Sequence, residues 1–416
     1  MLLIAFLVGC QRPPVTTYDP ELLAEIQTIR AFDNHAHPVR VVGAGEKPDR
    51  GFDALPVDNM EPASDPLTFR AKNPQVAEAA RALYGSADPA AKRHMIAAKG
   101  ALYPEWVLDQ WGVETMLANR VEMGPSIQPP RFHWVPYADA LIFPLDNSKL
   151  ASVNPDRKAF FALEDQLRQR YLGGAPLPST LAEYTAKVVT PTLEGQKKGG
   201  AVAVKFEAAY LRPLAFDKVD ETTAAAIYQQ KSPLAQDAYK PLQDYLFRYV
   251  AAECGRLGMA VHLHTMAGAG SYFQVAGVNP LLLESVLNDP DLRKTKIVMV
   301  HGGWPFIGEI TALLEKPTAY LDFSAQDLSL TPATLAVSIR KWLEFVPEKV
   351  LFGTDAYPYS DEMGWEESGW LAAKNGREAL AIALTGMMRD GEISRSRASE
   401  LARMVLRENA RALYGF

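Results

Sequence analysis

The sequence predicts a single β/α barrel, and three observations lead to that fold class. Short apolar runs recur along the chain with helical patterns between them, as strands alternate with helices in a parallel sheet. Several of these runs follow a glycine, the residue that commonly ends the preceding helix. Polar side chains stand at the ends of the runs, which is where a β/α barrel builds its active site.

Eight runs are expected to form the strands. In chain order they cover residues 29–34, 113–118, 138–143, 201–206, 259–264, 296–300, 319–323 and 349–352. The last two are joined by a helical pattern at 331–343, in which Thr331 suits the N-cap and Pro332 the first helical position. The rhythm of strand, helix and strand indicates repeated parallel β/α units.

Length and composition agree with one barrel. The chain has 416 residues, of which 48% are hydrophobic and 22% charged, and a formal net charge of -6. A barrel with insertions reaches this length without a second domain. Lys and Arg form no block, so a nucleic-acid surface is not expected and a small molecule is the expected partner.

Two stretches, 39–111 and 144–200, are too long to be simple connections. Helical patterns occupy 74–84, 89–99 and 156–171 within them. We expect both stretches to be helical insertions of the barrel domain, 21–416, that cover the barrel mouth. Loops on a rigid scaffold carry recognition, so substrate specificity is expected there.

Residues 1–20 are expected to be a lipoprotein-type signal and tether. The apolar run 1–9 is too short to span a bilayer and suits the core of a signal peptide. Its ending, Leu7-Val-Gly-Cys10, resembles a bacterial lipobox, which implies lipidation of Cys10 and an exported, membrane-anchored protein in the periplasm or at the cell surface. A basic n-region is missing, so whether Met1 is the true start stays open, and a plain apolar tail with a structural cysteine is the alternative. Cys254, in a helical pattern, is expected to be a buried small hydrophobe.

Two histidines close the first run, in the segment Phe-Asp-Asn-His35-Ala-His37. Residues two apart on a strand share a face, so His35 and His37 can bind one cation together. Imidazole suits zinc, iron and nickel. Alone, such a pair is equally consistent with two hydrogen-bonded structural histidines.

Four further polar side chains occur in or after the later runs. Lys205 lies in the run 201–206, His264 and His301 close the fifth and sixth runs, and Asp355 follows the eighth. Histidines at so many strand ends, together with an aspartate, indicate one site. An N-capping role for Asp355 is the competing interpretation.

The other histidines receive different interpretations. His262 shares a strand face with His264 and is its rival as a ligand, or a core residue. His94, in a helical segment, and His133, in a loop, are expected at the surface.

In this order the residues resemble the amidohydrolase superfamily, most closely its amidohydrolase-related branch. That family has an H-x-H after strand one, a Lys or Glu on strand four, a His on each of strands five and six, and an Asp on strand eight. The segments 258–265 and 279–306 are also similar to the family. The resemblance implies a TIM barrel that binds a divalent metal, with zinc preferred over manganese, iron or nickel. The matching residues are His35, His37, Lys205, His264, His301 and Asp355.

Lys205 separates one metal from two. In binuclear family members this lysine is carboxylated and bridges two metals. An ammonium buried in an apolar run is costly, which favours either a carboxylated Lys205 or a tight ion pair, and Glu207 shares its strand face.

The resemblance also implies the ligand sets. With two metals, which we favour, His35, His37 and Asp355 bind one metal and His264 and His301 the other. With one metal, His264 joins the first three ligands and His301 becomes an acid/base or electrostatic group.

The implied reaction is hydrolysis of an amide, lactone or ester bond in a small molecule by metal-activated hydroxide, with Asp355 as acid/base and His301 as a second catalytic residue. Two alternatives stay open: a mononuclear, metal-dependent non-oxidative decarboxylase, and a lipoprotein that binds a metal or ligand without catalysis. Arg120, Trp304 and Tyr357 lie just beyond strand ends and are candidate substrate contacts, with packing as their competing role.

Overall fold

The computed structural model describes residues 17–43, 45–55, 66–69, 73–230 and 232–416. The predicted lipidation site, Cys10, and most of the predicted signal and tether lie outside the described residues. Within the described ranges, no helix is at once long enough and apolar enough to cross a membrane.

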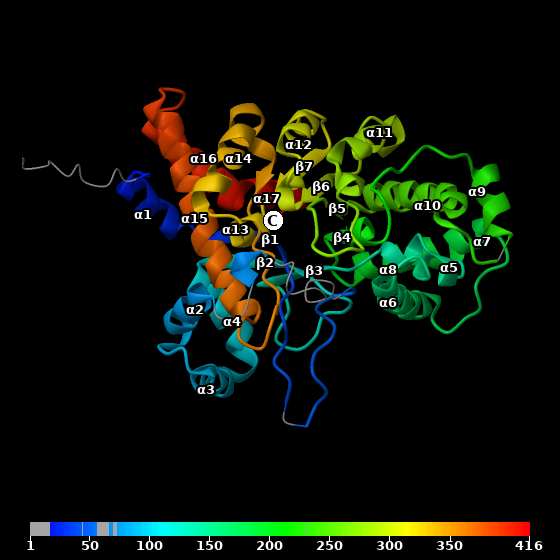
Figure 1. The fold of residues 1–416 in the computed structure, drawn as a ribbon, viewed down its shortest axis with the longest axis horizontal. Coiled ribbons are helices and arrows are strands. Elements are labelled where there is room, and N and C mark those ends of the chain that lie inside the picture. Colours follow the sequence, from blue (N-terminus) through cyan, green and yellow to red (C-terminus); the bar gives the residue numbers. More distant parts are fainter. Residues whose placement is uncertain (1–16, 44, 56–65, 70–72, 231) are drawn as a thin grey trace, which may run out of the picture.

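Eight parallel strands occupy the centre of the molecule (Figure 1). Within each of two groups the neighbours pair in parallel, in the orders β1-β2-β3 and β4-β5-β6-β7-β8. Their bounds are β1 (Ala31–Ala36), β2 (Val113–Asn119), β3 (Phe132–Val135), β4 (Ala203–Phe206), β5 (Ala260–His264), β6 (Ile297–Val300), β7 (Ala319–Asp322) and β8 (Val350–Leu351).

Backbone hydrogen bonds connect the two groups at both edges. Between β3 and β4, Lys205 N donates to Pro136 O at 2.8 Å and Ala138 N donates to Lys205 O at 2.8 Å. Between the segment after β8 and β1, Asp355 N donates to His35 O at 2.7 Å. The strands therefore follow one another around a ring, which is the predicted β/α barrel.

One predicted strand is wrong. The third strand is β3, whereas the run 138–143 forms a buried 3-10 turn at Asp139–Leu141. A short apolar run carries no periodicity that separates a strand from another buried segment, which explains the error. The same error displaced His133, which lies on β3, partly buried against the ring of Phe416 at 4.3 Å between centroids, and not in a loop.

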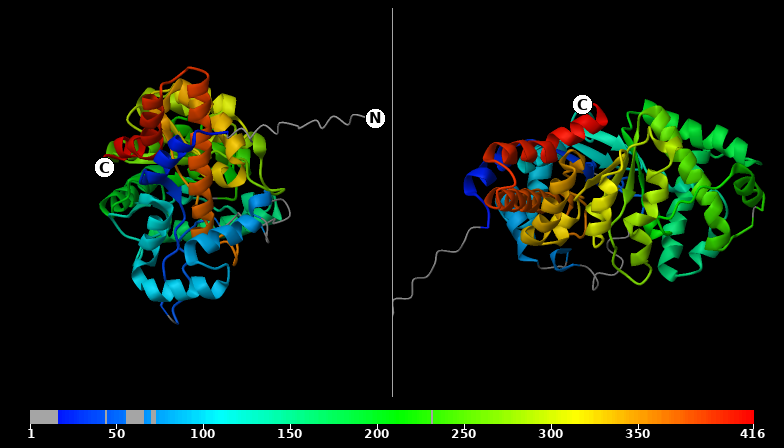
Figure 2. Two further views of the ribbon diagram at one scale, coloured as in Figure 1. Left: turned by 90° about the vertical axis from the view of Figure 1, so that its left-hand side faces the viewer. Right: turned by 90° about the horizontal axis from the view of Figure 1, so that it is seen from above.

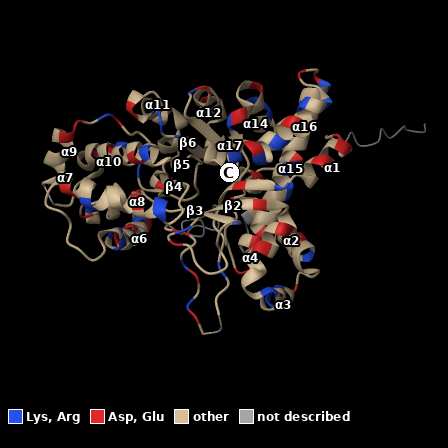
Figure 3. Cartoon of the chain, turned by 180° about the vertical axis from the view of Figure 1, so that it is seen from behind, with Lys and Arg blue, Asp and Glu red and all other residues tan. Residues whose placement is uncertain are grey.

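Helices surround the strands, and charges of both signs are spread over their outer surfaces (Figure 3). The helices are α1 (Pro20–Thr28), α2 (Pro74–Tyr84), α3 (Pro89–Lys99), α4 (Tyr103–Trp111), α5 (Ser148–Ala151), α6 (Pro155–Leu172), α7 (Leu181–Tyr184), α8 (Thr190–Lys198), α9 (Glu221–Tyr228), α10 (Gln236–Leu257), α11 (Glu284–Leu287), α12 (Ile307–Leu314), α13 (Gln326–Ser329), α14 (Pro332–Phe345), α15 (Trp365–Arg389), α16 (Arg395–Arg403) and α17 (Asn409–Tyr414). Cys254 is fully buried in α10, as predicted.

Capping explains why helix bounds in the long stretches were predictable. Asn73 and Asp88 accept hydrogen bonds from the first turns of α2 and α3, each of which begins with proline, and Gly85 ends α2 in the left-handed region. These helices and α4 form a layer against α15, while α6 packs on the turn Asp139–Leu141 (Figure 2). The loop 51–55, which lies between β1 and α2 in the chain, reaches the ligand-bearing end of the barrel, as described below.

The C-terminal helix α17 closes the opposite, N-terminal end of the barrel. The ring of Tyr414 stacks on Phe32 of β1 with centroids 5.9 Å apart, and the ring of Phe416 lies 5.5 Å from Phe32. Phe32 and Tyr414 belong to an apolar cluster that draws one or two side chains from most strands, namely Leu117, Val135, Ala203, Ala260, Val298, Val300 and Leu351. The lower barrel is therefore a packed core, and only its upper end is available for a site.

Candidate metal centre

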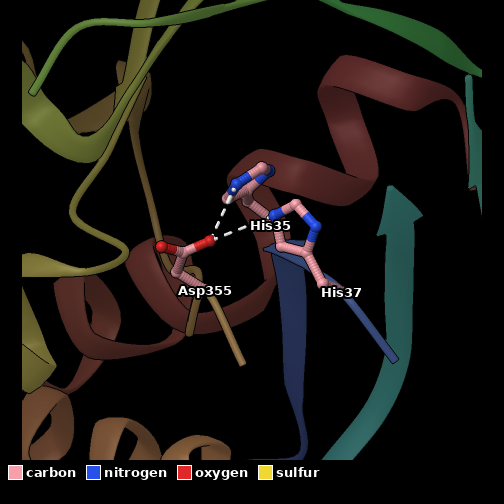
Figure 4. Close-up of side chains that lie close together, drawn as sticks. All are labelled: His35, His37 and Asp355. Carbon is pink, nitrogen blue, oxygen red and sulfur yellow. Dashed lines mark ion pairs between the residues drawn. The ribbon is translucent and has the colours of Figure 1, made fainter. Parts of the chain in front are cut away.

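Three predicted ligands converge at the C-terminal end of the strands. One oxygen of Asp355, Oδ1, lies 3.0 Å from His35 Nε2 and 3.3 Å from His37 Nε2 (Figure 4). One ligand atom from each residue can be chosen so that all three lie within 4.8 Å of one another. The two imidazoles are buried and only 12% of the Asp355 side chain is exposed.

The other three predicted residues lie beside this triad. The ring of His301 is 4.9 Å from that of His35 and 4.6 Å from that of His264, between centroids. Lys205 Nζ lies 3.3 Å from His35 Nε2. The structure thus brings all six residues into one buried group. His264 Nε2 lies 2.8 Å from the carbonyl of Met266.

His262 lies apart from the group. Its Nε2 is 2.7 Å from the hydroxyl of Tyr414 on α17, towards the closed end of the barrel. Of the two rivals on β5, His264 is therefore the one next to the candidate ligands.

Two of the site residues have an unusual backbone. His301 has φ of 72° and Asp355 has φ of 50°, a region that residues other than glycine rarely adopt. Such conformations persist only where the surroundings hold them, and they cluster at functional sites. Here the surroundings are two buried aspartates that sequence reasoning missed.

The first of these, Asp33, connects β1 to the segment after β8. Its Oδ1 accepts from Thr354 N at 3.0 Å and from His35 N at 3.2 Å, and its Oδ2 accepts from Thr354 Oγ1 at 2.6 Å. It thereby fixes one ligand, His35, and the residue before another, Asp355.

The second, Asp322, ends β7. Its Oδ1 accepts from His301 N at 3.0 Å and from Ser324 N at 3.1 Å, while its Oδ2 accepts from Asn34 Nδ2 at 2.6 Å. The candidate ligands were identified as polar residues at the ends of apolar runs. The same pattern would also have identified Asp322, which lies near the end of the seventh run.

The ionisation of the group suits a metal. Burial, with Lys205 as a further cause, lowers the pKa of His264 to about 3, and burial also holds the pKa of His35 and His301 well below the ordinary value. Burial opposes ionisation of Asp355, but His301 and the hydrogen bonds from His35 and His37 outweigh it and hold its pKa well below its usual range. Neutral imidazoles and an ionised carboxylate are the forms that bind divalent metals.

Hydrogen bonding also prepares His37 as a ligand. Its Nδ1 lies 2.9 Å from Phe52 O and 3.0 Å from Tyr137 Oη. Because a carbonyl can only accept, Nδ1 carries a proton, so Nε2, which faces Asp355, is the nitrogen that a metal would bind in place of its proton. Burial alone would lower the pKa of His37, but the hydrogen bond to Asp355 and the nearby charge of Asp53 outweigh this effect, so the pKa of His37 is raised overall. Tyr137 and the loop 51–55 were missed because no local pattern predicts how this loop folds over the rim.

A set of three buried carboxyl groups lies near Lys205, and we name Asp139, Glu164 and Glu207 the acid group. Asp139 Oδ2 accepts from Glu207 N at 2.9 Å, whereas both carboxyl oxygens of Glu164 and Oε2 of Glu207 have no hydrogen-bond partner among the described residues. Burial raises the pKa of Asp139 to about 7 and those of the two glutamates well above their ordinary values. The suggested ion pair between Lys205 and Glu207 is not formed in the described structure.

The candidate substrate contacts have different surroundings. The guanidinium of Arg120 is buried and donates to Pro38 O, Glu122 O and Asp49 Oδ1, which ties it to the loop after β1. Trp304 is half-buried after β6. Tyr357 is the one that touches a ligand, with its ring 5.2 Å from that of His37 between centroids.

Convergent imidazole and carboxylate ligands at the C-terminal end of a β/α barrel define a barrel enzyme with a metal site. The sequence profile of the amidohydrolase family matches residues 219–416. That region includes His264, His301 and Asp355, and the structure adds His35, His37 and Lys205 to them. The chain therefore matches the amidohydrolase family over residues 219–416, and this match, the fold and the candidate site together support a metal-dependent enzyme of hydrolase type.

Known proteins agree with this assignment. Over 190 residues, 44% of this chain, the sequence is 26% identical to protein fluG of Emericella nidulans, of which the match covers 21%. The chain thus spans about a fifth of the length of that curated relative. Among solved structures, a protein from Lactobacillus casei ATCC 334 assigned as a metal-dependent hydrolase superposes with a TM-score of 0.65 at 17% identity, covering 95% of this chain and 97% of that one. Glucuronate isomerase from Caulobacter crescentus superposes with a TM-score of 0.59 at 11% identity, covering 97% of each chain. At these identities the likeness concerns the fold.

Proposed function

We propose that this enzyme hydrolyses an amide, lactone or ester bond in a small molecule, with zinc as its metal. The observation that carries the proposal is the buried triad of His35, His37 and Asp355, with the carboxylate ionised and shared between the two imidazoles. Hydrolytic activity is also the class assigned to the similar protein from Lactobacillus casei.

A divalent metal bound to the triad would supply Lewis acidity that activates water and polarises the bond to be cleaved. The chain's own residues handle orientation and protons. Asp355, ionised and slightly exposed, is placed to take a proton from the attacking water and return it to the leaving group. His301, neutral and directly beside the triad, is the second candidate for proton transfer.

The number of metals depends on Lys205. We propose two metals bridged by carboxylated Lys205, since His264 and His301 lie together beside the triad and Lys205 approaches His35. The test is metal stoichiometry with ¹³C NMR after growth in ¹³C-bicarbonate. Two metals and a carbamate signal that disappears in Lys205→Ala support the proposal, while one metal and no carbamate signal contradict it.

The hydrolase itself is tested on purified full-length protein. We expect bound zinc by elemental analysis, and hydrolysis of at least one member of a panel of amides, lactones and esters. Activity should disappear on chelation and return with zinc. His35→Gln should lose metal and activity, whereas His133→Gln, on β3 and away from the triad, should keep both. Metal-free protein whose hydrolysis ignores chelator would refute the proposal.

A non-oxidative decarboxylase is the second candidate function. If the triad binds a single metal, decarboxylation is favoured, because the family resemblance connects sites with one metal to this chemistry. Release of carbon dioxide from a panel of aromatic and unsaturated acids, without hydrolysis of the first panel, would select it.

We further propose that the protein is exported and lipidated at Cys10. The supporting feature is the apolar run 1–9 that ends in Leu-Val-Gly-Cys. In a bacterial host, wild type should incorporate labelled palmitate and partition with membranes, and Cys10→Ser should do neither. Unlabelled wild-type protein in the soluble fraction would contradict this proposal.

A further inference from the structure

A chain of buried hydrogen bonds runs from the closed end of the barrel to the candidate metal centre. It begins at His262 on β5, whose Nε2 lies 2.7 Å from the hydroxyl of Tyr414. Tyr414 donates to Asn34 Oδ1, and Asn34 Nδ2 donates to Asp322 Oδ2 at 2.6 Å. The chain thus joins α17 to β1 and β7.

The second half of the chain reaches His301. Ser324 Oγ donates to Asp322 Oδ1 and lies 2.9 Å from His301 Nδ1. All of its members except Tyr414 are buried: His262, Asn34, Asp322, Ser324 and His301. The helix α17 is therefore connected by hydrogen bonds to His301 of the site, although it does not contact His301 itself.

Donor and acceptor capacity fixes the direction of every bond in this chain. The hydroxyl proton of Ser324 is committed to Asp322, so Ser324 Oγ accepts from His301, and Nδ1 of His301 carries the proton. The carbonyl of Ser324, 3.2 Å from the same nitrogen, can also only accept. His301 Nε2 is consequently left bare, which is the form needed to take a proton or bind a metal.

The direction holds at the other end too. Asn34 turns its amide nitrogen to Asp322, which leaves its oxygen to accept from Tyr414. The tyrosine oxygen then accepts from His262 Nε2, because the hydroxyl proton of Tyr414 is already donated to Asn34. Removing the Tyr414 hydroxyl would leave both Asn34 Oδ1 and His262 Nε2 without a partner in a buried environment, which is costly.

We propose that Tyr414 is a positioning residue for His301, acting through Asn34, Asp322 and Ser324. The helix α17 thus has a second role beyond filling the bottom of the barrel, since its terminal tyrosine sets the amide orientation that begins the chain. This inference rests on the proposed function, in which His301 serves the reacting centre. A phenylalanine would stack on Phe32 equally well, so the hydroxyl group itself carries the inference.

The test uses zinc-loaded, full-length protein labelled with ¹⁵N-histidine, with the His301 signals assigned by their loss in His301→Gln. In wild type, we expect His301 to show a protonated Nδ1 that exchanges slowly with solvent. In Tyr414→Phe, that proton should exchange about fivefold faster or more, the size expected for one lost hydrogen bond. Because no substrate is needed, this result is independent of the substrate panel that tests the hydrolase.

Phe416→Leu is the matched control, because it removes a second ring that lies beside Phe32, as Tyr414 does, and touches no member of the hydrogen-bonded chain. It should lower thermal stability and leave the His301 signals unchanged. Equal changes in both variants, or unchanged signals in Tyr414→Phe, would show that Tyr414 only packs and would overturn the proposal.

A double-mutant cycle covers the case in which Tyr414→Phe folds poorly. Tyr414→Phe and Ser324→Ala change residues that have no contact, so independent effects on the free energy of unfolding would add. If the two residues are coupled through the hydrogen-bonded chain, the double variant should lose less free energy of unfolding than the two single variants lose together. Losses that simply add would overturn the inference. If Tyr414→Phe does not fold, the Ser324→Ala variant is measured by itself. A shifted NMR signal of His262 Nε2 would support coupling through the hydrogen-bonded chain, and an unchanged signal would contradict it.

Discussion

Buried carboxyl groups at the ligand-bearing end of the barrel and in the acid group differ in their partners. Asp33 and Asp322 accept several hydrogen bonds each and hold the backbone of the ligands. Glu164 of the acid group accepts none from described residues, although it is equally buried. Burial raises the pKa of all these carboxyl groups, that of Asp33 to about 7, so the difference lies in what each group holds: the two aspartates fix backbone beside the candidate ligands, and Glu164 fixes none.

The same contrast occurs within one short segment. Asp322 ends β7 and is fully bonded, whereas Asp327 on α13 is equally inaccessible and has no partner for either carboxyl oxygen among the described residues. Burial and the nearby carboxylates raise the pKa of Asp327 well above its ordinary value. These two residues therefore form a natural pair for experiments.

The largest effect is expected at the ligand that both histidines share. Asp355→Asn keeps the shape of the side chain but removes its charge and its ability to take a proton, so kcat should fall by about 10³-fold, within the range for a lost general base. Zinc content, measured by elemental analysis, should fall as well. Asp327→Asn should retain both activity and metal, and loss of activity in both variants to the same extent would contradict this assignment.

Next in size is the exchange Asp322→Asn. The amide nitrogen would face the donor of Asn34 or of His301, so we expect a loss of about 2–3 kcal/mol in the free energy of unfolding, as for hydrogen bonds to a charged group. Asp327→Asn should change it by less than about 1 kcal/mol, because no hydrogen bond is lost. Urea unfolding followed by circular dichroism measures both, and similar losses would remove the distinction between the two aspartates.

A smaller effect is expected at the hydroxyl group beside His37. Tyr137→Phe removes the hydroxyl 3.0 Å from His37 Nδ1 and should weaken zinc binding about tenfold, the lower end for a residue that orients a ligand. Competition with a chromophoric chelator gives the dissociation constant. Tyr171→Phe, which loses the bond to the backbone of Tyr137 and the bond from Gln196 Nε2 but no contact with His37, should bind zinc as wild type does. Equal affinity in all three proteins would argue that Tyr137 only packs.

The last prediction concerns the dependence of stability on pH and the acid group. Asp139 has a pKa of about 7 in the folded protein, and an unfolded aspartate has one of about 3.9. Between these values the folded state binds more protons, so raising the pH lowers the free energy of unfolding, by up to ~1.4 kcal/mol per pH unit for one group. Above about pH 7 this contribution is fully lost.

Asp139→Asn should therefore flatten the decline in stability between about pH 5 and pH 7, measured by urea unfolding. The exposed Asp361→Asn should leave the slope unchanged. If the free energy of unfolding declines with pH equally in wild type and Asp139→Asn, the proton bound on folding belongs to another group.

Sequence alone was sufficient for the barrel and all of its strands but the third, and for the six converging side chains. Each ligand is marked locally, because an apolar run that ends in a polar residue is visible without knowing its neighbours in space. The third strand escaped because a buried turn and a buried strand share one composition. The partners Tyr137, Phe52 and Tyr414 escaped because they come from a loop and a terminal helix whose placement depends on long-range packing.

Closure of the barrel by bonds between its first strand and the segment after its last has a consequence for biosynthesis. Thr354 bonds to Asp33 across 321 positions of the sequence. A nascent chain that has reached only β7 would hold both histidines of the first strand but no carboxylate to complete the triad. A metal bound by this triad would thus be acquired only after nearly the whole polypeptide has been made, and a truncated product, however well its early helices fold, would be unable to retain it.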